Sequence, residues 1–145
     1  MLKLIPSLAE HIDAFIEMEQ YNDTAQFILP YTKAQHQTEM HKQDVIYLSI
    51  LSHKVLSGFI ILARQANREV EFRRIVVDSK FRGIGQQAIV QMEQYCMTQF
   101  DTQRIWLDVF ESNQRGLHIY NKLGYKQFKT APHQGQSLIL MEKYL

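Results

Sequence analysis

Cysteine is almost absent from this chain of 145 residues, which contains one, Cys96. An internal disulfide is therefore excluded, and a chain without disulfides is typical of a reducing cytosol. Cys96 lies on an apolar helical face, so we expect a buried thiol rather than a reactive nucleophile. The amino terminus lacks the long apolar core and small-residue cleavage site of a secretion signal. These absences predict a cytoplasmic protein.

An excess of either charge is also missing, because 16 Lys and Arg residues face 15 Asp and Glu residues. This balance gives no broad basic field to hold nucleic acid. No apolar run is long enough to cross a bilayer. The histidines are scattered, and His36 and His41 are five residues apart, so they do not share a helix face as metal ligands would. We expect no nucleic acid partner, no membrane contact and no metal.

The length suits one domain over residues 1–145, with a core that needs no metal or disulfide. Apolar periodicity predicts an α+β protein. The expected strands cover residues 2–5, 45–51, 55–63, 70–77, 104–110, 125–128 and 137–144. The expected helices begin after Ser7, Thr32, Gly83 and Asn113. Ser7 should cap the first of them, and Ser112 or Asn113 the last.

Alternation along the strand at 70–77 predicts a clean division between two faces. One face would carry Val70, Phe72 and Val76, and the other Glu71, Arg73, Ile75 and Val77. The strand at 104–110 follows a helical crossover, which predicts a parallel partner for the strand at 70–77.

Residues 76–88 run from an apolar strand through a short polar turn into a helix. Gly83 and Gly85 let the backbone turn tightly and approach a ligand closely. The first N–H groups of the following helix, with the positive end of its dipole, then point at the ligand. This arrangement predicts a cradle for a phosphate or a pyrophosphate.

Two common nucleotide motifs fit this cradle less well. Gly83, Gly85 and Ala88 match a loose dinucleotide fingerprint, but that motif belongs to the first strand and helix of a large doubly wound sheet, and only about sixty residues follow here. A phosphate-binding loop of an NTPase would end in Gly-Lys-Ser/Thr, which is missing.

A second motif completes a pattern. Asn113 is followed seven residues later by Tyr120, and Leu-Gly-Tyr at 123–125 closes that helix. Together with Arg-Gly-Ile-Gly at 82–85 after Val-Val-Asp at 76–78, this resembles the GNAT family of N-acetyltransferases across essentially the whole chain. The resemblance implies the GNAT, or acyl-CoA N-acyltransferase, fold. That fold has α/β/α layers and a mixed, mostly antiparallel sheet of about seven strands, splayed at its centre, with helices on both faces.

The resemblance also implies acetyl-CoA as cosubstrate. Backbone N–H groups in the cradle would hold its pyrophosphate, and the open strand edge would pair with its pantetheine arm. Asn113 would bond the arm or only cap its helix, and the two roles are compatible. The family usually has Gly or Ala where this chain has Gln87. The cofactor-binding residues implied are Val76, Val77, Arg82, Gly83, Ile84, Gly85, Gln86, Gln87 and Asn113.

Transfer to an amine needs a neutral nitrogen, a stabilised oxyanion and a proton for the leaving thiolate. Tyr120 stands at the family's general-acid position, although a tyrosine there is otherwise a core aromatic. The backbone N–H of Val77 is the oxyanion donor implied by the resemblance.

Two carboxylates compete as the catalytic base. Glu71 lies on the strand that leads into the cradle, where many family members hold a glutamate. Asp108 matches the catalytic glutamate of the ribosomal-protein alanine acetyltransferase type, but is one methylene shorter. Either acid could instead pair with Arg73 or Arg104. Water, or an amine that arrives deprotonated, remains a further alternative.

The implied function is direct transfer of acetyl from acetyl-CoA to a primary amine of a small molecule or peptide in a ternary complex. The alternative is an acyl-CoA-binding or sensory domain that transfers nothing. Residues 19–31 and 130–136 would select the acceptor. The final strand at 137–144 predicts a homodimer if it forms a sheet edge, and a monomer if the strand at 125–128 covers it.

Overall fold

The computed structural model describes residues 1–21, 27–81 and 83–145. The expected succession of elements is confirmed within them. In chain order they are β1 (Leu2–Pro6), a 3-10 turn (Ala9–His11), α1 (Ile12–Glu19), α3 (Lys33–Met40), β2 (Val45–Ser52), β3 (Val55–Gln65), β4 (Glu69–Val77), α4 (Gly85–Phe100), β5 (Arg104–Phe110), α5 (Gln114–Lys122), β6 (Lys126–His133) and β7 (Gln136–Tyr144). No helix in this described part is long and apolar enough to span a membrane.

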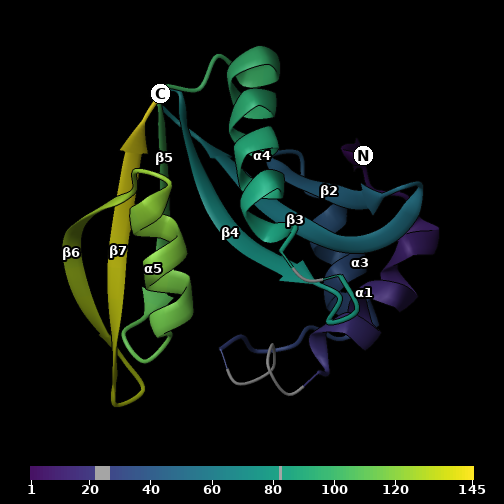
Figure 1. The fold of residues 1–145 in the computed structure, drawn as a ribbon, viewed down its shortest axis with the longest axis horizontal. Helices are drawn as coiled ribbons and strands as arrows, with labels where there is room; N and C mark the ends of the chain where they lie inside the picture. The colour runs from purple at the N-terminus through teal and green to yellow at the C-terminus, as the bar shows by residue number, and fades with distance from the viewer. Residues whose placement is uncertain (22–26, 82) are drawn as a thin grey trace.

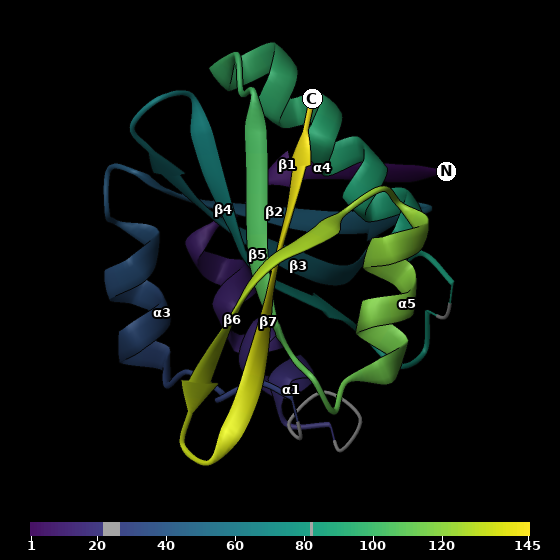
Figure 2. The same ribbon diagram turned by 90° about the vertical axis from the view of Figure 1, so that its left-hand side faces the viewer.

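The strands form one seven-stranded sheet in the order β1-β2-β3-β4-β5-β7-β6. Every neighbouring pair is antiparallel except β4 and β5, which run parallel as the helical crossover predicted. Helices α4 and α5 cover one face of the sheet, and α1 and α3 cover the other (Figures 1 and 2). The expected layered fold and mixed, mostly antiparallel sheet are confirmed.

The sheet splays between its two parallel strands. Three residue pairs join β4 to β5, the last being Glu71 with Trp106. Beyond this pair β4 turns away while β5 stays paired with β7 along its whole length, and Figure 1 shows the two halves of the sheet separating. The edge of β4 that faces β5 therefore carries no strand from Phe72 onward.

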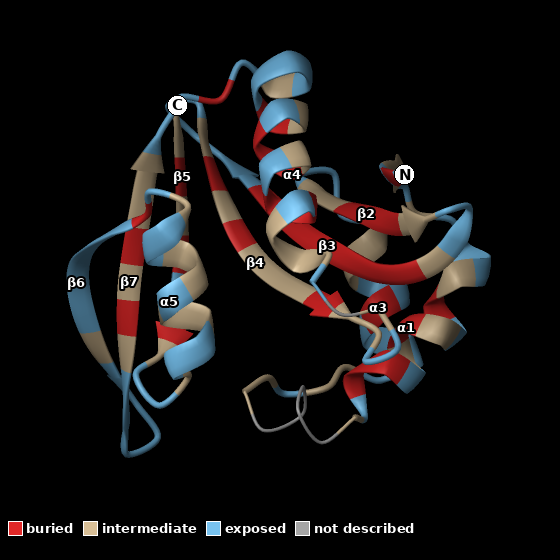
Figure 3. Cartoon of the chain, in the orientation of Figure 1, coloured by how far each residue is buried: buried red, intermediate tan, exposed pale blue. Residues whose placement is uncertain are grey.

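Two apolar clusters lie on opposite faces of the sheet. The larger joins the central strands to α4 and α5 and includes Leu62, Met92 and Ile105. The smaller lies under α1 and α3 and is built on Phe15 and Phe59, whose rings stack with centroids 4.2 Å apart. Figure 3 shows the buried residues concentrated on the central strands. β4 pairs with β3 from Glu69 to Val77. The edge of β4 that is open at the splay is therefore the one that faces β5.

A β-bulge in β4 overturns the expected division of its faces. Ile61 of β3 pairs with Arg74 and Leu62 pairs with Phe72, so Arg73 is an extra residue in β4. Alternation therefore shifts by one position after Phe72. Ile75 and Val77 pack against the same large cluster as Val70 and Phe72, whereas Val76 joins the smaller cluster. The prediction grouping Val76 with Phe72, and Ile75 and Val77 with Glu71, was wrong because the bulge cannot be seen in the alternation.

The expected N-cap of the first helix was also wrong. The Ser7 hydroxyl hydrogen-bonds the Ser49 hydroxyl at 2.7 Å across to β2, and a 3-10 turn precedes α1. The expected helix after Thr32 is confirmed, and the Thr32 hydroxyl caps it by accepting the Gln35 backbone N–H at 3.1 Å. Ser7 has a tertiary partner that local sequence does not reveal.

The last strand of the chain is not a sheet edge. β7 pairs with β5 on one side and β6 on the other, so the expectation of an open edge at 137–144 was wrong. β6 forms that edge and extends to His133 through Pro132, a residue that edge strands tolerate. Any pairing with a second copy on this side of the sheet would use β6.

Candidate active site

The cradle is the amino terminus of α4. The helix begins at Gly85, its N-cap Ile84 provides no side-chain cap, and its first turn contains no acidic residue. Asp78 shapes the preceding turn, since its carboxylate accepts the Lys80 N–H at 3.0 Å and its carbonyl accepts the Phe81 N–H at 2.9 Å. The expected contribution of Arg82 lies outside the described residues. Among the described residues no side chain caps the helix end, which suits an anion.

The two glycines of the cradle differ in what the fold requires of them. Gly83 has φ +82°, a left-handed conformation that other residues adopt at a cost. Gly85 has no such φ, and a Cβ added there would lie 4.0 Å from Val77 Cγ2, an ordinary contact. The fold itself thus tolerates a side chain at 85, and the missing Cβ leaves open space for a ligand. Gln87 is exposed and Gln86 half-buried in the same turn.

Val77 presents its backbone to the open edge of β4. The Asp78 N–H donates to the Ser57 carbonyl of β3 at 2.8 Å. Since successive residues of an antiparallel ladder face opposite edges, the Val77 N–H points toward the splay. The Val76 carbonyl faces β3, where a Cβ on Gly58 would come within 2.3 Å of its oxygen. Val77, rather than Val76, offers the backbone groups expected of an oxyanion or pantetheine site.

Asn113 caps α5 and retains a polar group. Its Oδ1 accepts the Gly116 N–H at 2.9 Å, which confirms the capping role. Within the described part of the chain, its Nδ2 donates to no other residue. The capping bond and a ligand contact therefore use different atoms of the same side chain.

Tyr120 projects from α5 among aromatic rings. Its ring lies edge-to-face with Phe72, at a centroid distance of 6.1 Å, and 6.0 Å from the ring of Tyr125. Burial, and then the charge of Asp108, raise the pKa of Tyr120 to about 12. The phenol consequently stays protonated across the physiological range, as a hydrogen-bond donor must. No described side chain accepts from its hydroxyl.

Glu71 and Asp108 have different surroundings. The Glu71 carboxylate accepts a hydrogen bond from Arg73 at 3.1 Å, and Arg73 also donates to Glu39 of α3 at 3.1 Å. Asp108 makes no ion pair with a described residue, and Arg104 binds Glu69 and Glu142 instead. The alternative that each acid pairs with a strand arginine thus holds for Glu71 alone.

The surroundings of Asp108 raise the pKa of its carboxyl group. Solvent reaches the residue, yet partial burial of its carboxylate raises its pKa, and the negative charge of Glu71 raises it further. His133 opposes this shift. Asp108 thus combines a raised pKa with no ion-pair partner among the described residues, two features that suit a proton acceptor.

Sequence reasoning missed a buried polar group on the α1 and α3 face. We read His36 as unremarkable, and placed Glu19 at the start of an acceptor loop, yet both are fully buried and bonded to each other. The signal available was the Arg73-Arg74 pair, two consecutive charges in a strand whose following residues are all apolar. Cys96 is buried as expected, and burial raises the pKa of its thiol to about 12. Among the described residues no group of three His, Cys, Asp or Glu side chains is placed to hold a metal.

A mixed sheet that splays between two parallel strands, with an uncapped helix end at the gap, defines the class of acyl-CoA N-acyltransferases. The chain belongs to the acetyltransferase (GNAT) family, whose model matches residues 10–125. The activity of this class, acetyl-CoA-dependent N-acetyl transfer, is thereby that of the chain. A search of curated protein sequences found no match.

Solved structures with the same fold include spermidine N-acetyltransferases from Vibrio cholerae. One, in complex with CoA and spermine, is 16% identical with a TM-score of 0.84, over 99% of this chain and 95% of that chain. A chimera of the Vibrio cholerae enzyme with hSSAT is 18% identical with the same TM-score and coverage. A third, described as a dodecamer in an intermediate state, is 16% identical with a TM-score of 0.78, over 99% of this chain and 93% of that chain. At these identities the likeness is one of fold, and it does not single out the expected ribosomal-protein alanine acetyltransferase type.

Proposed function

We propose that this protein acetylates a primary amine carried by a small molecule or a peptide, with Asp108 as base and Tyr120 as acid. The observation that supports the assignment is that Asp108, at the splay, lies near enough to Tyr120 for its charge to add to the effect of burial in raising the pKa of that phenol. A phenol that stays protonated and a carboxylate that readily accepts a proton are the complementary pair that amine acylation needs.

The residues of the cradle fit acetyl-CoA. Backbone N–H groups at Gly85, Gln86 and Gln87 stand at the uncapped end of α4, where a pyrophosphate would bind. Asn113 Nδ2 and the Val77 backbone would hold the arm along β4. Acetyl-CoA supplies the acetyl group as an activated thioester.

The chain's own residues account for each proton. Asp108 takes a proton from the ammonium or the attacking amine, so that the nitrogen can form its bond to the acetyl carbon. The Val77 N–H stabilises the oxygen that becomes negative as that bond forms. Tyr120 donates its proton, or a hydrogen bond, to the sulfur as the carbon–sulfur bond breaks. Glu71, bound by Arg73, keeps the pKa of Asp108 raised.

The acceptor is tested with purified protein by following thiol release from acetyl-CoA. Spermidine and spermine, named for solved structures of this fold, form one arm of the panel. A peptide with an amino-terminal alanine forms another, because Asp108 stands where the alanine acetyltransferase type has its glutamate. Calorimetry with acetyl-CoA and desulfo-CoA provides the binding control. Binding of both without thiol release on any amine would overturn the catalytic proposal in favour of the acyl-CoA-binding alternative.

We infer the domain organisation and oligomeric state of the protein from the same sheet. We propose that residues 1–145 act as one domain in the cytoplasm, supported by one sheet that includes strands from both ends of the chain. A homodimer would use the exposed edge strand β6, whose outer backbone groups face no strand of the described chain. Light scattering that gives a mass near the 17.1 kDa of one chain, with and without acetyl-CoA, would contradict the dimer.

A further inference from the structure

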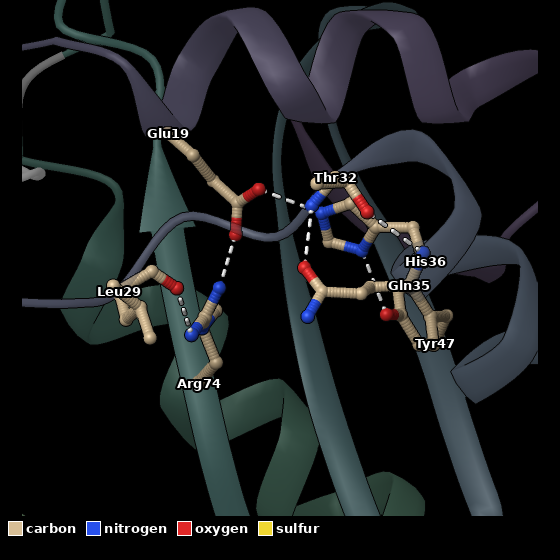
Figure 4. A network of polar contacts seen from close by, with 7 residues as sticks. All are labelled: Glu19, Leu29, Thr32, Gln35, His36, Tyr47 and Arg74. Atoms are coloured by element: carbon tan, nitrogen blue, oxygen red, sulfur yellow. Dashed lines mark hydrogen bonds and ion pairs between the residues drawn. The ribbon is translucent and has the colours of Figure 1, made fainter.

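A buried polar network joins four elements on the face of the sheet covered by α1 and α3 (Figure 4). His36 of α3 bonds Glu19 of α1 through Nε2 at 2.6 Å and the Tyr47 hydroxyl of β2 through Nδ1 at 2.8 Å. Arg74 of β4 donates to the other oxygen of Glu19. His36 and Glu19 have no exposed surface.

The hydrogen bonds of this network are complete. Both ring nitrogens of His36 have a partner, Tyr47 on one side and Glu19 on the other, and the positive Arg74 balances the negative Glu19. Burial raises the pKa of Tyr47, so its hydroxyl keeps the proton it donates. Burying an ion pair in this way is often no more stabilising than apolar packing of the same volume. The network is therefore better explained by the positioning of neighbouring segments than by stability alone.

Arg74 extends the network to the segment that enters α3. Its second terminal nitrogen donates to the Leu29 carbonyl at 2.9 Å, and its guanidinium carbon lies 4.1 Å from the centre of the Tyr31 ring. Tyr31 also contacts the His36 ring edge-to-face at 5.1 Å. One arginine thus fixes both the backbone and the aromatic side chain of this segment.

Tyr31 forms one wall of a surface pocket of about 400 Å³ that runs along α3. The other lining residues, Ala34, Gln35, Thr38 and Glu39, follow one face of the helix. Glu39 at the far end is tied through Arg73 to Glu71, beside Asp108. The pocket therefore has polar and aromatic walls and is connected, by one arginine, to the carboxylates at the splay.

We propose that Arg74 is a positioning residue for the acceptor, holding Tyr31 in place so that the α3 pocket receives the part of the acceptor remote from its reacting amine. This inference rests on the proposed acetyl transfer to an amine. The β-bulge makes the arrangement possible, because it places Arg73 and Arg74 consecutively on one face. Arg73 donates hydrogen bonds to Glu39 and Glu71, and Arg74 contacts Tyr31 in the pocket wall.

The test compares Arg74→Lys with wild type, since lysine retains the charge opposite Glu19 but lacks the planar fork that reaches Leu29 and stacks on Tyr31. Arg64→Lys is the matched control, because Arg64 also stacks on an aromatic ring, Phe100 at 4.5 Å, on the solvent-exposed part of β3. The double variant Glu19→Gln/Arg74→Met removes both buried charges and provides a second folded test if the lysine variant is unstable.

Two probes, spermidine and a peptide with an amino-terminal alanine, are used in two measurements. The first is KM and kcat by thiol release. The second is calorimetric affinity of the probe for the complex with desulfo-CoA, which needs no chemistry. We expect Arg74→Lys to raise KM and the dissociation constant of the better probe by about tenfold, with kcat and the affinity for acetyl-CoA changed less than about twofold. Arg64→Lys should match wild type.

The outcomes separate this inference from the proposed function. Unchanged acceptor KM and affinity in folded Arg74→Lys and in the double variant overturn the inference, even if their melting temperatures fall. Wild-type protein that binds a probe but transfers nothing overturns the proposed function, while weaker probe binding in the variants still supports a role for Arg74. Wild-type protein that binds neither probe overturns the inference itself.

Discussion

Asp108 lies two residues beyond Trp106, the register partner of Glu71, so the two carboxylates share one face of the sheet where β4 and β5 separate. Partial burial, and then the charge of Glu71, raise the pKa of Asp108, and the hydrogen bond from Arg73 occupies Glu71. The two acids are equivalent candidates by residue type, but their neighbours differ. Glu71 is hydrogen-bonded to Arg73, whereas Asp108 has no ion-pair partner among the described residues.

Replacing the proposed base should abolish most turnover. We expect Asp108→Asn to lower kcat by about a hundred- to ten-thousandfold, the usual contribution of a positioned base. The affinity for acetyl-CoA, measured by calorimetry, should stay the same because Asp108 is not part of the cradle. Asp101→Asn is the control, since Asp101 is a left-handed residue where asparagine is well tolerated. Unaltered kcat in Asp108→Asn would assign the proton to water or to Glu71.

Replacing Glu71 should change the pH profile more than the rate. Since the negative charge of Glu71 raises the pKa of Asp108, Glu71→Gln should lower that pKa, and the unpaired Arg73 charge acts in the same direction. A base works when deprotonated, so the acidic limb of kcat/KM should move to lower pH. His133 and Tyr120 face Asp108 as well and remain in place. An acidic limb that does not move, or moves upward, contradicts the assignment.

The proposed acid is tested by removing one oxygen atom. Tyr120→Phe should lower kcat by about ten- to a thousandfold while leaving acetyl-CoA affinity nearly unchanged, because the ring keeps its packing against Phe72 and Tyr125. Tyr95→Phe on α4 is the matched control, because Tyr95 is a helical tyrosine that also lies edge-to-face with a phenylalanine, Phe100. If both variants keep wild-type kcat, Tyr120 is a packing residue.

The cradle glycines should separate binding from folding. Gly85→Ala should keep its stability in urea but lose affinity for acetyl-CoA by about tenfold or more, because the new methyl group fills space left open toward the ligand. Gly83→Ala should instead lose about 1–3 kcal/mol of folding free energy, since alanine is strained at φ +82°. Full acetyl-CoA affinity in Gly85→Ala would place the cradle elsewhere.

A buried carboxylate on α4 should contribute to stability without touching the reaction. Glu93 accepts hydrogen bonds from the Tyr125 hydroxyl and from Lys143, each at 2.9 Å. Tyr125→Phe should therefore cost about 1.5–3 kcal/mol in urea unfolding, the range for a hydrogen bond to a charged group. Turnover per folded molecule should match wild type. An unchanged urea midpoint would show that Glu93 finds another partner when the phenol is removed.

Local sequence signals determined much of this protein. Apolar runs indicated all seven strands, although β6 continues to His133 instead of ending at residue 128. The helix start at Thr32 and the choice of Ser112 or Asn113 as a cap could be predicted because capping involves atoms a few residues apart. The glycines at 83 and 85 indicated a cradle because backbone freedom depends on residue type. The order of these motifs was enough to indicate the family.

Tertiary structure decided the rest, because it depends on contacts between residues far apart in the chain. The bulge at Arg73 arises from the register between β3 and β4, which alternation within one strand cannot reveal. The partners of Glu71 and Asp108, separated by 37 positions but close in space, decide which acid has the raised pKa. His36 became a central polar residue only when folding brought Glu19 and Tyr47 within hydrogen-bonding distance of it, and Arg74 of a fourth element then bonds Glu19. Residue types thus determined which chemical groups are available, and long-range packing determined which of these groups lie together in a site.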